Sequence, residues 1–171
     1  MKQDIEMMVD YDIYSKIYSD FDSFSSVLEK WKENNEEIVF TNGCFDIIHL
    51  GHVDSLLNSA KLGTKLIVGL NSDESVTRLK GKGRPILNLE ARTTLLAAFV
   101  FVDAVIIFTE DTPENLIAQI LPDLLVKGNE YTIDEIAGHK TVLEHGGIVK
   151  TLDLVPGVST TQMIEKIKNL D

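Results

Sequence analysis

Short apolar runs alternate with helical patterns along most of the chain. Five runs are rich in β-branched residues and continuous enough for strands buried on both faces. They cover residues 38–41, 66–70, 104–108, 124–126 and 148–152. The repeated order of strand, helix and strand predicts an α/β fold. We expect a Rossmann-like, doubly wound, five-stranded parallel sheet with helices on both faces.

Apolar stripes at helical spacing lie between these runs. The three stripes are, in order, Val53, Leu56, Leu57 and Ala60; Leu116, Ile117, Ile120 and Leu121; and Met163, Ile164, Ile167 and Leu170. We expect the first helix to close at Gly63. The second should open with Thr112 as its cap and Pro113 at its first position, and the third near Ser159.

Residues 1–36 differ in charge from the rest of the chain. Residues 1–37 carry ten acids against four lysines. Within them, Phe24, Val27, Leu28 and Trp31 stand at helical spacing, which predicts one amphipathic helix packed on the main domain. We therefore expect two parts, an acidic helical extension at 1–36 and the main domain at 37–171.

Amino-acid composition and net charge exclude several classes of protein. With 44% apolar and 25% charged residues, the 171-residue chain is typical of a globular domain. Its net charge of −11 argues against nucleic acid or membrane partners, because both are polyanions. No stretch reaches the roughly 20 apolar residues of a membrane span, and the N-terminal residues lack the apolar core of a secretory signal. Cys44 is the single cysteine, so we expect a cytoplasmic protein without a disulfide.

One segment, residues 78–92, is basic although the chain as a whole is acidic. Between residues 78 and 92 a single acid, Glu90, stands among five basic residues: Arg78, Lys80, Lys82, Arg84 and Arg92. The pattern is compatible with a solvated loop. Because it comes after the second strand, it is also placed to bind an anion at the carboxyl edge of the sheet.

The loop after the first strand, residues 41–52, holds two of the four histidines. If a helix begins near Gly51, then His49, His52 and the free N–H groups of the first turn converge, which suits phosphate. Gly51 would let a ligand approach the backbone, and Gly43 would allow the turn that leaves the strand. Three alternatives stay open: a zinc site with Cys44, a Cys44 nucleophile, and histidines that only cap the loop.

The string Gly43-x-Phe45-Asp46-x-x-His49-x-Gly51-His52 resembles the signature of the cytidylyltransferase-like nucleotidyltransferases. These enzymes transfer a nucleoside monophosphate from a triphosphate to a phosphorylated acceptor. Similar strings at 71–74, 79–85, 90–92, 102–105, 127–131 and 157–161 extend the resemblance from residue 38 to 168. The strings NSDE, LKGKGRP, ILPDLLVKGNEY, EIAG and STT are most similar to the adenylyltransferase domain of ADP-heptose synthases, which serve lipopolysaccharide biosynthesis.

Two departures from glycerol-3-phosphate cytidylyltransferases bear on the substrate. Those enzymes carry an arginine shortly before the string that corresponds to residues 157–161, and this chain has none at 154–156. They carry a second arginine at the position where this chain has Val100. Both departures weigh against a cytidylyltransferase acting on a small phosphorylated alcohol. That activity and a non-catalytic nucleotide sensor remain the alternatives.

The resemblance implies that AMP passes from ATP, accompanied by Mg²⁺, to a sugar 1-phosphate such as heptose 1-phosphate. ADP-heptose synthases have a sugar kinase domain ahead of this region. A 36-residue extension is too short for one, so we expect a separate kinase upstream. We also expect a homodimer, because relatives of this kind are commonly dimers and the apolar stretch 95–106 is long enough for an interface.

The resemblance also assigns roles. His49 and His52 are expected on the triphosphate, with His52 nearer the reacting phosphorus and Lys82 on phosphate as the third catalytic residue. The expected nucleotide-binding residues are Thr41, Asn42, Gly43, Phe45, Gly51, Lys127, Gly128, Ser159 and Thr160. The expected phosphate- or acceptor-binding residues are Asp46, Asn71, Asp73, Lys80, Arg84 and Arg92.

Two of these assignments have a structural alternative, and a third is open between two ligands. Ser159 could serve only as a helix cap, and Asp46 as a buried carboxylate held by backbone N–H groups. Asp73 could contact either the acceptor or magnesium. The sequence names no firm metal ligand.

Overall fold

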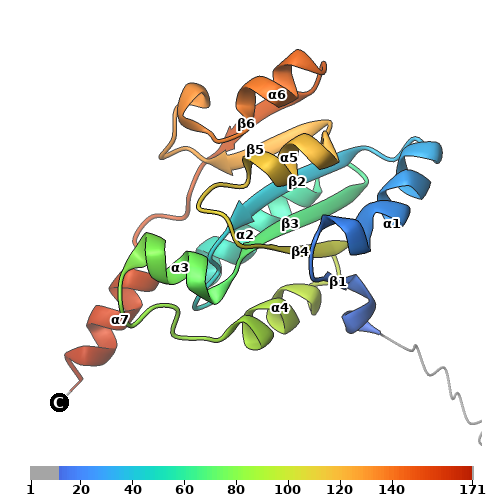
Figure 1. The fold of residues 1–171 in the computed structure, drawn as a ribbon. Helices are drawn as coiled ribbons and strands as arrows, with labels where there is room; N and C mark the ends of the chain where they lie inside the picture. Colours follow the sequence, from blue (N-terminus) through green and yellow to red (C-terminus); the bar gives the residue numbers. More distant parts are fainter. Residues whose placement is uncertain (1–11, 171) are drawn as a thin grey trace, which may run out of the picture.

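The structure is a computed structural model that describes residues 12–170 (Figure 1). Its strands are β1 (Ile17–Tyr18), β2 (Ile38–Gly43), β3 (Lys65–Asn71), β4 (Ala104–Phe108), β5 (Leu124–Gly128) and β6 (Ile148–Leu152). Its α-helices are α1 (Phe21–Glu33), α2 (Leu50–Ala60), α3 (Asp73–Lys80), α4 (Leu89–Ala97), α5 (Glu114–Ile120), α6 (His139–Glu144) and α7 (Thr160–Lys168). There are also two 3-10 helices, η1 (Ile13–Lys16) and η2 (Ile133–Glu135).

All strands of the sheet run parallel, in the order β1-β4-β3-β2-β5-β6. From β2 the chain moves first toward β3 and β4, and later crosses to β5 and β6 on the other side. The strand order therefore reverses beside β2, and ligands of such sheets bind outside the carboxyl ends at this point. The predicted Rossmann-like fold is confirmed.

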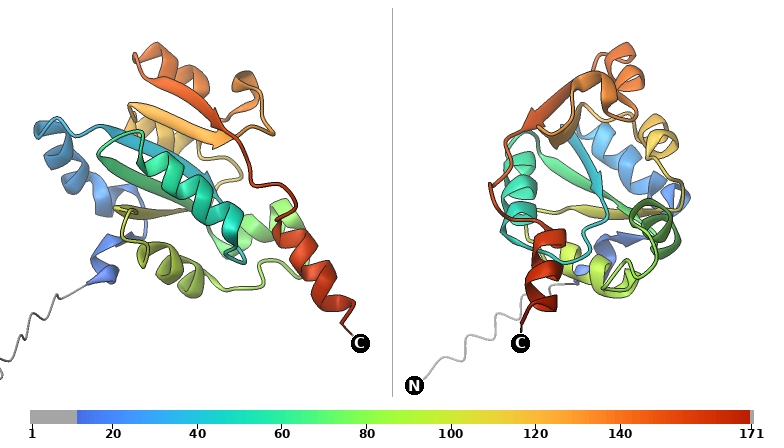
Figure 2. Two further views of the ribbon diagram at one scale, coloured as in Figure 1. Left: turned by 180° about the vertical axis from the view of Figure 1, so that it is seen from behind. Right: turned by 90° about the vertical axis from the view of Figure 1, so that its left-hand side faces the viewer.

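Helices cover both faces of the sheet (Figure 2). On one face, Phe24 of α1 and Ile117 of α5 are fully buried in a cluster with Phe40 and Ile67. On the other face, Leu56 of α2 and Leu96 of α4 pack against residues of β2 and β3. The two apolar clusters hold the sheet between two layers of helices, as the alternating pattern predicted.

Within residues 12–170 the sheet has six strands, so the predicted number of five was wrong. The additional strand, β1, pairs Ile17 with Val105 and Tyr18 with Ile106 at the edge of the sheet. Two residues are too few to show a periodic pattern, which is why the sequence did not reveal them. The predicted amphipathic helix is confirmed as α1, in which Phe24 and Leu28 are buried. Residues 1–11, with part of the acidic extension, lie outside the described residues.

Three local predictions also need correction. Helix α5 begins at Glu114 with Pro113 as its N-cap, one residue later than predicted, and without a side-chain cap. Lys80 ends the helix α3 and does not lie on a loop. The sequence did not indicate α3, because only Ser75 and Val76 of this polar helix are buried. The left-handed residue after β2 is Phe45 (φ 44°), so the turn does not depend on Gly43.

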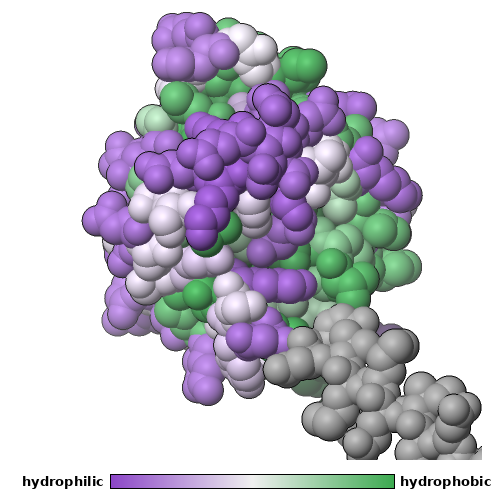
Figure 3. Space-filling view, turned by 90° about the vertical axis from the view of Figure 1, so that its right-hand side faces the viewer, coloured by the Kyte–Doolittle hydropathy of each residue, from purple (hydrophilic) through white to green (hydrophobic). Residues whose placement is uncertain are grey.

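The surface on one side of the molecule combines hydrophilic and hydrophobic regions (Figure 3). Figure 3 views the side of α1 and the amino ends of the strands, where hydrophilic residues run across much of the surface. None of the helices within residues 12–170 is long and apolar enough to cross a membrane.

Candidate active site

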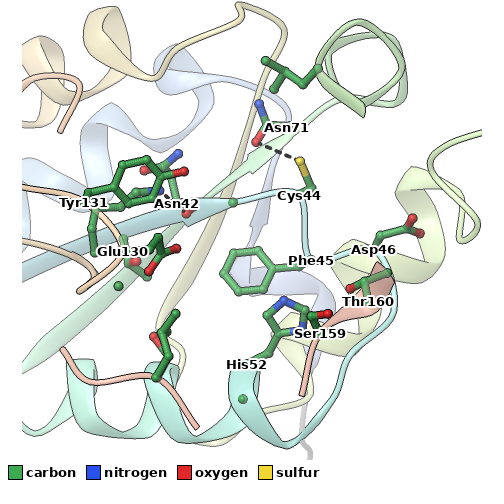
Figure 4. Close-up of a pocket in the computed structure, with 18 of the residues that line it drawn as sticks. Asn42, Cys44, Phe45, Asp46, His52, Asn71, Glu130, Tyr131, Ser159 and Thr160 are labelled. Atoms are coloured by element: carbon green, nitrogen blue, oxygen red, sulfur yellow. Dashed lines mark hydrogen bonds between the residues drawn. The ribbon is translucent and has the colours of Figure 1, made fainter. Parts of the chain in front are cut away.

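A cavity of about 610 Å³ opens at the carboxyl ends of the strands. Its walls come from the end of β2, the first turn of α2, the segments after β3, β4, β5 and β6, and the start of α7. Figure 4 shows Phe45 and His52 near its centre, with Tyr131 and Glu130 on one side. The cavity therefore stands at the point where the strand order reverses.

His49 and His52 form the centre of this site. Their rings stack with centroids 3.7 Å apart and planes 18° from parallel. His49 is the N-cap of α2, and its Nδ1 accepts the backbone N–H of His52 at 3.4 Å. An accepting Nδ1 carries no proton, so the proton of the neutral His49 ring lies on Nε2, where it can be donated to a ligand.

His52 is the more enclosed of the two histidines. Burial, reinforced by the neighbouring His49, lowers the pKa of His52 to about 4, and burial also lowers the pKa of His49. Both rings are therefore neutral near pH 7 in the free protein. The Nδ1 of His52 is buried and has no hydrogen-bond partner within the described residues. The backbone of Ile47 lies against this ring and acts to raise its pKa, in opposition to burial. Because the Nδ1 has no exposed surface, a ligand in the cavity would meet the other atoms of the ring.

Tight packing places these rings. The ring of Phe45 lies 5.2 Å from that of His52, between centroids. A Cβ at Gly43 would stand 3.1 Å from the Phe45 ring, and a Cβ at Gly51 would stand 3.1 Å from the Nδ1 of His49. Both glycines therefore leave room for side chains of the loop itself, and larger residues would displace the aromatic ring or the histidine.

The β5 side of the cavity combines a lysine with an aromatic ring. Lys127 donates to the carbonyl oxygen of Asn42 at 3.1 Å, and its ammonium lies 5.5 Å from the centroid of the Tyr131 ring. Burial lowers the pKa of Lys127, while the nearby Glu130 carboxylate acts in the opposite direction. This side therefore offers one cation and one flat ring to a ligand.

The start of α7 forms another wall. Ser159 is its N-cap, and its hydroxyl accepts the N–H of Gln162 at 3.2 Å. Ser159, Thr160 and Thr161 all line the cavity. The predicted cap is thus present, and the free N–H groups of this helix N-terminus face the same space as the histidines, which favours an anion.

The basic residues of segment 78–92 differ in whether they line the cavity. Lys80 and Arg84 line the cavity. Arg84 pairs with Asp46, which is 1% exposed and also accepts the N–H groups of Ile86 and Leu87 at 2.7 and 2.9 Å. Asp46 therefore holds residues 84–87 in place through an ion pair and two backbone hydrogen bonds.

The other basic residues lie outside the cavity lining. Lys82 is exposed at the tip between Gly81 and Gly83. Arg92 is fully buried, and its guanidinium donates to the carbonyl oxygens of Cys44 (2.7 Å) and Asn71 (2.8 Å) and to Asp73 (2.6 Å). The structure thus places Arg92 and Asp73 together beneath the site.

Most of the residues that the sequence assigned to the site meet in the cavity. The residues found there are Thr41, Asn42, Gly43, Phe45, Asp46, His49, Gly51, His52, Asn71, Lys80, Arg84, Lys127, Gly128, Ser159 and Thr160. Lys82, Asp73 and Arg92 are not among the lining residues.

Sequence reasoning assigned no part in the site to several lining residues, among them Asp111, Glu130, Tyr131, Leu154 and Val155, and it gave Thr112 only the role of a helix cap. Each comes after the carboxyl end of a strand, which is the signal that could have marked them.

The open alternative of a zinc site finds no support in the geometry. The Sγ of Cys44 contacts the Oδ1 of Asn71 at 3.9 Å. Residues 12–170 contain no group of three or more histidine, cysteine or acidic residues that could hold a metal ion. Burial raises the pKa of the Cys44 thiol, which disfavours the thiolate that a zinc ligand or a nucleophile requires.

Comparisons with known proteins identify relatives of this chain. The Bifunctional protein HldE of Haemophilus influenzae (strain PittGG) is 58% identical over 139 residues, which are 81% of this chain and 29% of that protein. The HldE protein of Vibrio cholerae (strain ATCC 39541) is 50% identical over 159 residues, or 93% of this chain and 32% of the relative. The chain thus spans about a third of the length of these relatives.

A solved structure shows the same fold. The crystal structure of the lipopolysaccharide core biosynthesis protein from Thermoplasma volcanium GSS1 matches with a TM-score of 0.58 and 31% identity, over 70% of this chain and 97% of that one. Residues 40–166 match the cytidylyltransferase-like family, and this range includes the histidine loop, the basic segment and the start of α7. The resemblance of the motifs is confirmed: the chain belongs to the cytidylyltransferase-like family.

Proposed function

We propose that this protein transfers AMP from ATP to a sugar 1-phosphate, specifically heptose 1-phosphate, and releases ADP-heptose and pyrophosphate. The observation that carries the proposal is the stacked pair of His49 and His52, which lines a cavity where the N-termini of α2 and α7 meet. The 50–58% identity to the HldE proteins supports the adenylyl and heptose assignments within the family.

The cavity offers different chemistry on its two sides. Tyr131, Leu154 and Val155 provide an aromatic ring and aliphatic side chains beyond β5 and β6, which suit a purine. Lys80 and Arg84 provide cations beyond β3, which suit a sugar phosphate. The two histidines stand between these sides, where the α-phosphate would lie.

The reaction is an in-line displacement. An oxygen of the acceptor phosphate forms a bond to the α-phosphorus of ATP, and the bond from that phosphorus to the bridging oxygen breaks, so that pyrophosphate leaves with the electron pair. The attacking phosphate is already anionic, so the reaction needs no general base. Catalysis rests on alignment of the two phosphates and on stabilisation of the charge that develops.

The histidines act as donors in this scheme. The Nε2–H of His49 and the ring of His52 donate to the triphosphate from positions fixed by their stacking. The approach of an anion favours the imidazolium and therefore raises the pKa of His52 from about 4. The start of α7, with Ser159 and Thr160, holds the β- and γ-phosphates of the departing pyrophosphate.

We expect ATP to bind as its Mg²⁺ complex. Mg²⁺ keeps several waters and is commonly held through substrate phosphates. Residues 12–170 provide no cluster of three metal-ligating side chains, which fits a cation held mainly by the nucleotide.

A pyrophosphate-release assay tests the proposal. It would compare ATP with CTP against α- and β-heptose 1-phosphate and glycerol 3-phosphate, with the products separated by chromatography. We expect ADP-heptose from ATP and one anomer. Turnover of CTP with glycerol 3-phosphate alone would favour the cytidylyltransferase alternative. Tight ATP binding without turnover of any acceptor would favour the nucleotide sensor.

We propose that the reaction takes place in the cytoplasm and that a sugar kinase activity supplies the sugar 1-phosphate. We also propose a homodimer. Exposed apolar side chains support it, because Val100 is 78% exposed and Ile167 and Leu170 of the C-terminal segment are 59% and 69% exposed. Light scattering should give twice the monomer mass, and Ile167→Glu should lower it; a monomer mass for the unchanged protein at micromolar concentration would contradict the dimer.

A further inference from the structure

Asp111 and Thr112, in the connection between β4 and α5, line the cavity. We propose that these two side chains bind hydroxyl groups of the acceptor sugar and so select among sugar phosphates. The inference rests on the proposed adenylyl transfer and names the residues that would recognise the sugar itself.

The order of the strands places this connection on the acceptor side. The sheet runs β1-β4-β3-β2-β5-β6, so residues after β4 and β3 stand on one side of the histidine loop and residues after β5 and β6 on the other. The side beyond β5 and β6 carries the apolar groups suited to a purine. A sugar whose phosphate meets Lys80 and Arg84 would therefore extend along the side of Asp111 and Thr112.

Hydrogen bonds hold the connection in place. The Nε of Arg78 donates to the Oδ1 of Asp111 at 2.7 Å, and another nitrogen of the same guanidinium donates to the carbonyl oxygen of Thr109. The Ser75 hydroxyl donates to the carbonyl oxygen of Glu110 at 2.8 Å. Both Arg78 and Ser75 belong to α3, so the connection is fastened to one helix at two points. A fixed position of the binding groups is what selection among similar ligands requires.

The Asp111 carboxylate has an oxygen that is available to accept hydrogen bonds from a ligand. Within residues 12–170, Arg78 is the only hydrogen-bond partner of the Asp111 side chain, and it engages one of the two oxygens. The Asp111 side chain is 63% exposed, so sugar hydroxyls can reach its other oxygen without a rearrangement. A carboxylate accepts several hydrogen bonds, and the Thr112 hydroxyl can donate or accept one more.

The charge of Asp111 is compatible with an anionic substrate. Arg78 lies against it and offsets the repulsion that the carboxylate would exert on the sugar phosphate. On the same helix, Lys80 lines the cavity. Helix α3 thus supplies one cation that positions Asp111 and another that meets the substrate.

Steady-state kinetics of Asp111→Asn and Thr112→Val, alone and combined, test the inference. The acceptor is the heptose 1-phosphate anomer that the unchanged protein uses. We expect the KM for this acceptor to rise about tenfold or more in Asp111→Asn, the scale of a lost hydrogen bond to a charged group, and further in the double variant. The KM for ATP should stay within about twofold, since the nucleotide lies on the other side.

The matched control is Glu110→Gln, which removes the neighbouring carboxylate of the same connection. Glu110 does not line the cavity, and its side chain accepts the N–H of Thr109, which glutamine can also do. We expect both KM values to be unchanged in this variant.

The outcomes separate the inference from the proposed function. An unchanged acceptor KM in the double variant, with an active unchanged protein, would overturn the inference and leave the adenylyl transfer intact. An equal rise of both KM values would also overturn it, because it would indicate general loosening of the site. If the unchanged protein releases no pyrophosphate with any sugar 1-phosphate, the proposed function fails and the inference fails with it.

Discussion

The imidazole of His52 lies stacked on that of His49, with 3.7 Å between their centroids, and its buried Nδ1 has no partner in the described part of the chain. His49 in turn caps the helix on which His52 stands, and its Nδ1 accepts the backbone N–H of His52, which leaves the proton of the neutral His49 ring on Nε2. Two stacked imidazoles, both with lowered pKa values, therefore line the cavity, which suits their proposed role as donors to the triphosphate.

Replacement of His52 should separate catalysis from folding. In His52→Ala we expect kcat to fall by about 10²-fold or more, the scale of one lost donor to developing charge, while the fold is retained. Pyrophosphate release and circular dichroism would measure the two effects. His145→Ala is the control, because His145 is exposed at the end of α6 and does not line the cavity. Full activity of His52→Ala would refute the role.

The same histidine should make stability depend on pH. The pKa of His52 is about 4 in the folded protein and about 6.5 in an unfolded chain, so between these values the unfolded state binds more protons. The free energy of unfolding therefore falls as pH falls through this window. From pH 7 to pH 5 we expect a loss of about 1–2 kcal/mol from this group.

Urea unfolding at both pH values would measure that loss. In His52→Gln the difference between pH 7 and pH 5 should shrink by about the same 1–2 kcal/mol, because glutamine does not titrate. The pKa of His49 is also lowered by burial, so a smaller dependence in the same direction should remain. An identical pH dependence in both proteins would show that His52 does not titrate as described.

Arg92 should contribute to stability far more than its exposed neighbour Arg78. Its buried guanidinium joins the carboxyl ends of β2 and β3 through the carbonyl oxygens of Cys44 and Asn71. In Arg92→Met these oxygens lose their charged donor, and we expect a loss of about 2–4 kcal/mol in the free energy of unfolding. Arg78→Met, the control, breaks an exposed pair with Asp111 and should cost less than about 1 kcal/mol. Equal losses in the two variants would contradict this assignment.

The histidine loop could be predicted from the sequence, whereas the burial of Arg92, the strand β1 and the place of Asp111 could not. The histidine loop was predictable because a strand, a glycine-containing turn and a helix start stand next to one another in the chain. The burial of Arg92 was not, because its partners include backbone carbonyl oxygens from distant segments, and every residue has a carbonyl oxygen. Strand β1 forms only because β4 offers it an open edge. Asp111 lines the cavity and pairs with Arg78 of α3, a polar helix without an apolar stripe that sequence patterns could reveal.

Asp46 should control the order of the basic segment. Its carboxylate is 1% exposed and binds Arg84 together with the N–H groups of Ile86 and Leu87. Asp46→Asn keeps the shape but removes the charge and replaces one accepting oxygen by a donor. We expect faster amide exchange at Ile86 and Leu87, and a KM for the sugar phosphate that rises about tenfold as Arg84 loses its fixed position. Hydrogen exchange and pyrophosphate release would measure these effects.

Asp103→Asn supplies the comparison for that experiment. Asp103 also binds a backbone N–H group, that of Leu66 at 2.8 Å, and it also pairs with a basic residue, Lys65, but at the start of β3, away from the cavity. This variant should lose stability, with exchange at Ile86 and Leu87 and the KM for the sugar phosphate unchanged. Asp46→Asn could instead lower the free energy of unfolding with no local change in amide exchange. That result would show that Asp46 stabilises the fold and does not set the position of Arg84.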